Sequence, residues 1–279
     1  MVGLRAKRAA ANHIQQTHAV SERRACRVIE IDRSSHRRQP KEEVDLELLQ
    51  SLHELSNRYP RFGYRKIHVK LLEQEFIVSR ERVRILRRHE GLSLTVKRPK
   101  RRRTGISHGL VRQALYPHHV WSYDFMSDQT DDSRSLKWLT LTDEYTRRGL
   151  RVYCARSITS LDVIEQLKVL IMLNGCPHYI RSDNGPEFIA HALQQWLKKK
   201  HIHTQYIDPG SPWQNAYGEG FNAVFRDGCL DRWLFASPHE AQHIADRWLH
   251  EYNEERPHGG LGMLTPAEFE RRCRYQEAS

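Results

Sequence analysis

One stretch constrains the fold of this chain more than any other: residues 179–188, with the sequence YIRSDNGPEF. It reads as a short strand that ends in a turn, because Gly185 can adopt a positive φ and Pro186 cannot continue a strand. A helical pattern begins near Glu187. Asp183 is therefore expected at the carboxyl end of a strand, where α/β proteins gather ligand-binding groups.

Two further acidic residues complete a candidate site. Glu219 follows Asp183 with 35 residues between them, in a segment of helical pattern, and Asp124 ends the strand-like run WSYD. Three carboxylates on separate elements suit Mg²⁺, which prefers oxygen ligands and keeps several waters. Phosphodiester cleavage and joining proceed on two such ions about 3.5–4 Å apart. We expect Asp124, Asp183 and Glu219 to be catalytic and to bind two divalent ions.

Other polar groups compete for this role, because a single acidic residue is usually a solvated surface group. The competing acids have structural explanations. Asp128, Asp131 and Asp132 fall in a polar loop, whereas Asp143 lies in a turn and Glu187 at the start of a helix. The histidines have no paired cysteines beside them, so exposed or backbone-bonded histidine is favoured over zinc.

Charge is unevenly distributed along the 279 residues. The first 112 contain 27 Lys and Arg against 12 Asp and Glu, whereas the remainder contains 18 against 22. This asymmetry indicates a nucleic-acid-binding front joined to a second unit; a merely solvated surface would not explain the segregation. No apolar run approaches the roughly 20 residues that span a bilayer. Five scattered cysteines and the lack of a signal-peptide pattern predict a cytoplasmic protein.

The basic front divides into three parts. Residues 1–41 hold two short helical candidates, 20–29 with Ser21 as its cap and 32–38, which suit either a helix-turn-helix or a frayed basic tail. The helical spacing of apolar residues over 42–96 predicts a second helical DNA-binding domain. Residues 97–112 form a basic linker, and the side chains expected along the phosphate backbone are Lys97, Arg98, Lys100, Arg101, Arg102 and Arg103.

The last helix of the second domain, expected over 80–89, is capped by Ser79, with Val83 and Leu86 facing the core. Its opposite face is rich in arginine. A solvated helix face would usually balance basic with acidic residues, so DNA contact is favoured. The expected DNA-binding residues are Arg80, Arg82, Arg84, Arg87 and Arg88.

From residue 113 the pattern becomes α/β. A three-stranded antiparallel meander precedes alternating helices and strands, which predicts a mixed sheet flanked by helices. The expected elements are strands 119–126, 136–142, 150–155 and 202–206, helices 160–173 (capped by Ser160), 187–200 and 238–255, and a helix that carries Glu219 and ends near Asp227. We expect a core over 113–237 and a helical extension over 238–279. On the Glu219 helix, Asn222 and Arg226 are candidates to hold a DNA phosphate.

At these residues the chain resembles a known family. The motifs WSYD (121–124), SDNGPEF (182–188) and PGSPWQNAYGEGFN (209–222) are similar to the three DDE blocks of bacterial insertion-sequence transposases. They resemble the OrfB-type integrase-core subunit of the insertion-sequence-three family, which is related to retroviral integrases. Residues 58–67 and 252–269 also resemble that family's second helix-turn-helix and its C-terminal signature.

The resemblance implies a ribonuclease H-like core, preceded by all-α helix-turn-helix domains, with Mg²⁺ or Mn²⁺ bound by a D,D(35)E triad. It implies DNA strand cleavage and transfer at the terminal inverted repeats of a mobile element in the bacterial nucleoid. Double-stranded DNA, further copies of the chain and an upstream-frame product are the implied partners. Gly218 and Gly220 depart from the family pattern, and each glycine costs a helix about 1 kcal/mol relative to alanine, which predicts a loose turn around Glu219.

Three functions fit these observations. A transposase is favoured because the three carboxylate motifs occur together. A DNA-binding regulator with a silent core would bind element ends without cutting them. A nuclease with a similar core would hydrolyse DNA without joining it.

Overall fold

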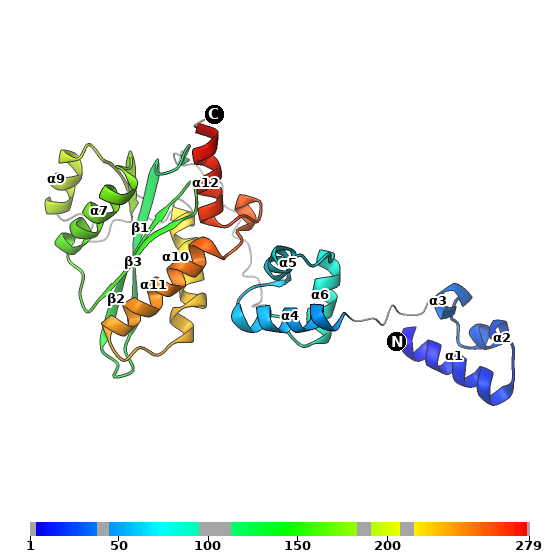
Figure 1. Ribbon diagram of the computed structural model, residues 1–279. Helices are drawn as coiled ribbons and strands as arrows, with labels where there is room; N and C mark the ends of the chain where they lie inside the picture. The colour runs from blue at the N-terminus through cyan, green and yellow to red at the C-terminus, as the bar shows by residue number, and fades with distance from the viewer. Residues whose placement is uncertain (1–3, 38–44, 95–112, 183–190, 207–214, 278–279) are drawn as a thin grey trace. The chain divides into compact units, whose positions relative to one another are not determined.

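The computed structural model describes residues 4–37, 45–94, 113–182, 191–206 and 215–277 (Figure 1). The chain divides into two compact units, residues 1–57 and 58–279. None of the helices within these described ranges is long and apolar enough to cross a bilayer.

The first unit is helical. It contains α1 (Leu4–His18), α2 (Glu22–Val28), α3 (Arg33–Arg37) and most of α4 (Leu46–Arg58). Ser21 stands at the N-cap of α2, as expected, but its hydroxyl makes no capping hydrogen bond. The sequence analysis did not predict α1, because this helix buries alanine in place of a stripe of large apolar residues.

The second unit begins with two helices that pack on each other, α5 (Tyr64–Glu73) and α6 (Arg80–His89). Ile67 and Leu71 of α5 and Val83 and Leu86 of α6 are buried. Ser79 caps α6 by accepting a hydrogen bond from the Arg82 amide at 3.2 Å, as predicted.

A five-stranded mixed sheet follows, with the strand order β3-β2-β1-β4-β5. The predicted meander is confirmed, since neighbouring members of the first three strands pair antiparallel. β4 pairs parallel with β1, and β5 pairs parallel with β4. The strands are β1 (Val120–Gln129), β2 (Ser135–Asp143), β3 (Gly149–Ala155), β4 (Tyr179–Ser182) and β5 (His203–Tyr206). Three antiparallel strands followed by two parallel ones confirm the expected mixed α/β class.

Helices cover both faces of the sheet (Figure 1). α7 (Ser160–Asn174) and α9 (His191–Lys199) share one apolar core with Trp121 and Tyr123 of β1. α10 (Ala216–Gly228) and α11 (Pro238–Glu254) share the other core with Trp138 of β2. Two 3₁₀ turns lie on either side of α11, η2 (Leu230–Arg232) before it and η3 (Gly259–Leu261) after it. A last helix, α12 (Pro266–Glu277), was not predicted individually.

The expected cap of α7 was wrong by one residue. Thr159, not Ser160, is the N-cap, and its hydroxyl accepts a hydrogen bond from the Asp162 amide. The Asp162 carboxylate in turn accepts a hydrogen bond from the Thr159 amide at 2.7 Å. Reciprocal bonding of this kind needs an acidic or amide residue three positions after the cap, which only the Thr159 register supplies.

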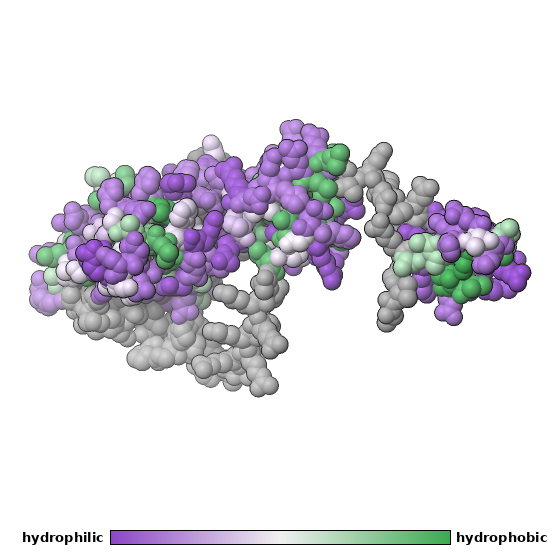
Figure 2. Space-filling view, turned by 90° about the horizontal axis from the view of Figure 1, so that it is seen from below, coloured by the Kyte–Doolittle hydropathy of each residue, from purple (hydrophilic) through white to green (hydrophobic). Residues whose placement is uncertain are grey.

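The surface seen in Figure 2 is mainly hydrophilic, and apolar residues appear there in small separate patches. This agrees with a mean hydropathy of −0.72 and a net charge of +11.

Candidate active site

Asp124 lies in the middle of β1, opposite Thr140 of the neighbouring strand β2. Asn222 of α10 joins these strands to the helix: its Nδ2 donates to Asp124 Oδ2 at 2.8 Å, and its Oδ1 accepts from the Thr140 hydroxyl at 2.8 Å. Asn222 is only 8% exposed, so its two hydrogen bonds are shielded from water. The network fixes α10 beside the Asp124 carboxylate.

Glu219 is carried on the same helix, three residues before Asn222. Residues three apart on a helix lie on neighbouring parts of its surface. The Asn222–Asp124 hydrogen bond therefore brings the helical turn that bears Glu219 to the strand that bears Asp124. Asp124 is half-buried and Glu219 is exposed, so solvent and a substrate have access to this pair.

The glycines around Glu219 have different surroundings. A Cβ on Gly218 would lie 2.7 Å from Asn215 Oδ1, whereas a Cβ on Gly220 would meet nothing within 4 Å. Asn215 is buried at the start of α10. Gly218 therefore has a packing role, since a larger residue would displace the Asn215 side chain.

Asp183 lies outside the described residues, and its part in the site stays a prediction. The described part of β4 ends at Ser182. In the parallel register of β1 and β4, Ser122 pairs with Arg181. In the sequence each of these two residues precedes one of the two predicted aspartates by two positions.

A buried ion pair anchors β4 next to this point. Arg181 Nη1 donates to both carboxylate oxygens of Glu144, at 2.8 and 2.6 Å, and Arg181 Nη2 donates to Gln205 Oε1 at 3.0 Å. Burial raises the pKa of Glu144 to about 7, and the Arg181 charge opposes that rise. The ion pair was not predicted from the sequence, although an arginine inside a short strand indicates that its charge has a buried acidic partner.

Two of the competing acids have structural roles. Asp143 is fully buried and accepts hydrogen bonds from the Thr146 hydroxyl at 2.6 Å and the His118 amide at 3.1 Å. Burial raises the pKa of its carboxyl. Asp132 accepts from Arg134 Nε at 2.6 Å in the β1–β2 hairpin. Both therefore stabilise turns, as expected for Asp143 from its position.

DNA contact by Asn222 stays a prediction; in this structure its amide is engaged by Asp124 and Thr140. Arg226 is half-buried, and its Nη2 donates to the Ser127 carbonyl at 3.1 Å. Arg226 thus stands two turns after Glu219 on the same helix and stays a candidate for DNA contact.

One of the five α6 arginines was wrongly expected on the surface. Arg87 is only 3% exposed, and its guanidinium donates to the carbonyls of Phe62 and Leu92, each at 2.7 Å. It follows Val83 by four residues and so shares that residue's buried face. Arg84 is exposed and donates to Glu81 at 2.9 Å. The basic linker residues, from Lys97 to Arg103, lie outside the described residues.

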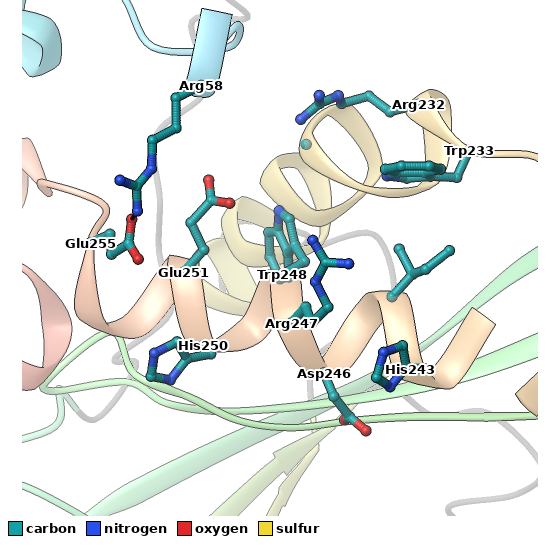
Figure 3. A pocket seen from close by; sticks show the side chains of 12 residues that line it. Arg58, Arg232, Trp233, His243, Asp246, Arg247, Trp248, His250, Glu251 and Glu255 are labelled. Atoms are coloured by element: carbon teal, nitrogen blue, oxygen red, sulfur yellow. Dashed lines mark hydrogen bonds and ion pairs between the residues drawn. The ribbon is translucent and has the colours of Figure 1, made fainter. Parts of the chain in front are cut away.

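A hollow beside α11 is separate from these groups (Figure 3). Arg58 Nη2 donates to Glu255 Oε2 at 2.8 Å at one end of it, and the Tyr59 hydroxyl donates to the same oxygen. Trp233 and Trp248 line another part. None of the predicted catalytic residues that the structure describes is among its lining residues.

Comparisons with known proteins identify similar families and structures. Residues 115–212 and 200–266 match the family "Integrase core domain", and residues 40–102 match "HTH-like domain". The chain is similar to the catalytic core domain of HTLV-2 integrase in complex with magnesium, with 20% identity and a TM-score of 0.47 over 57% of this chain and 99% of that one.

Two relatives from insertion elements match nearly the whole chain. A 31.7 kDa protein of insertion element IS407 from Burkholderia multivorans is 35% identical over 259 residues, which is 92% of each protein. A 39.2 kDa protein of insertion element IS476 from Xanthomonas euvesicatoria is 34% identical over 275 residues, covering 98% of this chain and 79% of the relative. At this identity and coverage, the chain belongs to the insertion-element transposases of the DDE transposase and integrase family, enzymes that transfer DNA strands.

Proposed function

We propose that the protein binds the terminal inverted repeats of its insertion element and catalyses metal-dependent strand cleavage and strand transfer with Asp124, Asp183 and Glu219. The hydrogen bond from Asn222 to Asp124 carries this proposal, because it joins the Asp124 strand to the Glu219 helix. A chance surface acid would have no such connection to a second candidate ligand.

The metal is proposed to be Mg²⁺ or Mn²⁺, with two ions per site. The donor set fits, since carboxylate oxygens are the ligands these ions prefer and solvent access leaves room for bound water. When bound, the ions lower the pKa of the attacking oxygen and stabilise the leaving 3′ oxygen. Asn222 fixes the orientation of the Asp124 carboxylate, and the Glu144–Arg181 pair holds β4, the strand that precedes Asp183 in sequence.

DNA binding is assigned to the basic front of the chain. We place DNA-binding modules in residues 1–41 and 42–96, with a basic linker over 97–112, a core over 113–237 and its extension over 238–279. Arg80, Arg82 and Arg88 of α6 and Arg226 of α10 are the described side chains proposed to reach phosphates. The enzyme is proposed to act as an oligomer on paired element ends. A chain reduced to residues 113–279 should lose sequence-specific binding, and retained specificity would overturn this division.

The catalytic assignment is tested with a labelled duplex that carries the element end, taken from the DNA that flanks the gene. Mg²⁺ or Mn²⁺ should support both cleavage and joined products on a denaturing gel. Asp124→Asn, Asp183→Asn and Glu219→Gln should each lower both rates by about 10³-fold or more, as expected for a loss of several kcal/mol of metal-dependent stabilisation.

Asp131→Asn is the matched control, because it removes an exposed carboxylate from the hairpin after β1. It should keep wild-type activity. Full activity of Asp183→Asn would refute the triad. Tight binding to the end duplex without cleavage in either metal would identify a regulator, and cleavage without joined products would identify a nuclease.

A further inference from the structure

Three side chains of the first unit converge far along the chain from the predicted triad. Glu22 and Cys26 lie four residues apart on α2 and therefore share a face, and His36 lies on the following helix α3 (Figure 1). One ligand atom of each residue lies within 4.8 Å of the other two. A thiolate, an imidazole and a carboxylate together are a donor set for Zn²⁺.

His36 gives the clearest indication of a ligand. Its Nε2 lies 2.8 Å from Asn12 Oδ1, which can only accept, so Nε2 carries the proton. Its Nδ1 is buried and has no hydrogen-bond partner in the described part of the chain. The side chain is 10% exposed. Metal-binding histidines commonly have this arrangement, in which one ring nitrogen donates to a neighbour and the other holds the ion.

The contact between His36 and Glu22 leaves room for a cation. His36 Nδ1 lies 3.6 Å from Glu22 Oε1, an ion-pair distance for a protonated imidazole but too long for a hydrogen bond. In the neutral imidazole both atoms are acceptors, and a buried acceptor without a donor is unfavourable. An ion bound to both atoms would make two attractive contacts.

Cys26 and Glu22 are compatible with this role. Cys26 is 2% exposed, and burial, followed by the charge of Glu22, raises the pKa of its thiol. The free thiol is therefore protonated, and metal binding would release that proton to solvent. Arg37 donates to Glu22 from Nε and Nη2, each at 2.8 Å. Because each carboxylate oxygen has two lone pairs, Arg37 can remain bound while Oε1 contacts an ion.

The small core of residues 4–37 supplies an independent reason for a metal. The buried apolar residues of this segment are Ala11, Ala25, Cys26 and Ile31. Chains of fewer than about 40 residues seldom fold on so small a core without a disulfide, a metal or a partner. The described cysteines are all free thiols. A metal contact between α2 and α3 would tie together the helices that this core holds weakly.

We propose that Glu22, Cys26 and His36 bind one Zn²⁺ ion, with water as the fourth ligand, and that this ion fixes α3 against α2. The site is separate from the proposed DDE triad and would hold whether or not that triad is catalytic. The sequence contains no paired cysteines and histidines here. A single cysteine with one ligand four residues before it and another ten residues after it has no recognisable zinc motif.

The test uses the full-length protein, stripped with a chelator and titrated with Co²⁺ as a spectroscopic substitute for Zn²⁺. One equivalent should produce a thiolate-to-cobalt charge-transfer band, and Zn²⁺ should displace it. Cys26→Ser should abolish the band, and His36→Gln should weaken binding by about tenfold or more. Cys176→Ser, which changes an exposed thiol, is the matched control and should leave the band unchanged.

Two further measurements distinguish this site from the catalytic one. Asp124→Asn should leave the thiolate band intact, since that carboxylate belongs to the other proposed site. Zn²⁺ should also slow amide hydrogen exchange in residues 22–37 of the wild type but not of Cys26→Ser. If Cys26→Ser differs from the metal-free wild type by unfolding residues 22–37 in chelator, Glu22→Gln is used in its place. The Co²⁺ affinity of Glu22→Gln should then be lower than that of the wild type. A band that survives Cys26→Ser, or exchange that Zn²⁺ does not change, would overturn the proposal.

Discussion

Two ion pairs with similar geometry lie in opposite surroundings in this molecule. Arg181 and Glu144 meet at 2.6 Å with side chains 4% and 0% exposed, and Arg37 and Glu22 meet at 2.8 Å with side chains 61% and 25% exposed. The first pair lies beside the large two-sided core of the sheet, and the second lies in residues 4–37, whose apolar cluster contains four buried residues. Similar contacts therefore differ in what they contribute, because burial sets the penalty for leaving one partner unpaired.

The largest effect is expected from Glu144→Gln. This change leaves the Arg181 charge buried without its carboxylate, which typically destabilises a protein by about 3–5 kcal/mol. Hydrogen exchange of the β1 and β4 amides in the full-length protein should accelerate accordingly. Glu165→Gln, on the exposed surface of α7, is the matched control and should have little effect. If the β1 and β4 amides exchanged at the wild-type rate in Glu144→Gln, burial would not explain a difference in stabilisation between the two ion pairs.

The next effect concerns the polar network at the site. Asn222→Ala removes the hydrogen bond to Asp124 and leaves the Thr140 hydroxyl with only its longer contact, 3.3 Å, to the Asp124 carbonyl. Loss of a group that orients a metal ligand typically lowers metal affinity or activity by about 10–100-fold. The activation of strand cleavage should need correspondingly more Mn²⁺. Asn174→Ala, which loses only a contact to the Leu170 carbonyl, is the control. Equal metal dependence in both variants would show that Asn222 serves packing alone.

Lys66 extends the comparison to a half-buried cation that has no carboxylate partner among the described residues. Burial, helped by the charge of Arg256, lowers its pKa to about 7 from 10.5. His258 adds no further positive charge, since burial and the nearby cations lower its pKa to about 3. The unfolded chain thus binds more protons than the folded one between pH 7 and 10.5, so stability rises with pH over that window.

The rise is at most about 1.4 kcal/mol per pH unit for one proton. Lys66→Met should flatten the pH dependence of the unfolding midpoint between pH 7 and 10 and should raise the midpoint at pH 7. Lys168→Met, on the exposed surface of α7, should change neither. A lower midpoint for Lys66→Met at pH 7 would show that this cation is paired in solution.

The sequence predicted the parts of this molecule that depend on local patterns. The arginine-rich helix α6 and the antiparallel meander were predicted because capping and alternation are visible over a few residues. Asp124 and Glu219 were predicted from the motifs around them, and the structure joins their elements through Asn222.

The sequence did not reveal contacts between residues far apart in the chain. Glu144 and Arg181 are separated by 37 positions, and no periodicity connects them. The hydrogen bond from Asn222 to Asp124 was not predicted either, because the position of Asn222 on α10 was visible but its partner on β1 was not. Arg87 was placed on the surface because a charged residue is usually exposed, whereas its long side chain buries its stem and reaches two backbone carbonyls.

The smallest effect is expected at the exposed pair. Arg37→Gln, measured in chelator so that metal plays no part, removes the Glu22 contact, but water can solvate both groups. Hydrogen exchange of the α2 amides should therefore match the wild type within error. Arg23→Gln, an exposed change on the same helix for which no hydrogen bond or ion pair is described, provides the baseline. If Arg37→Gln alone unfolded residues 22–37, a solvated ion pair would be stabilising a segment with a very small apolar core. Burial would then not explain the difference between this pair and Glu144–Arg181.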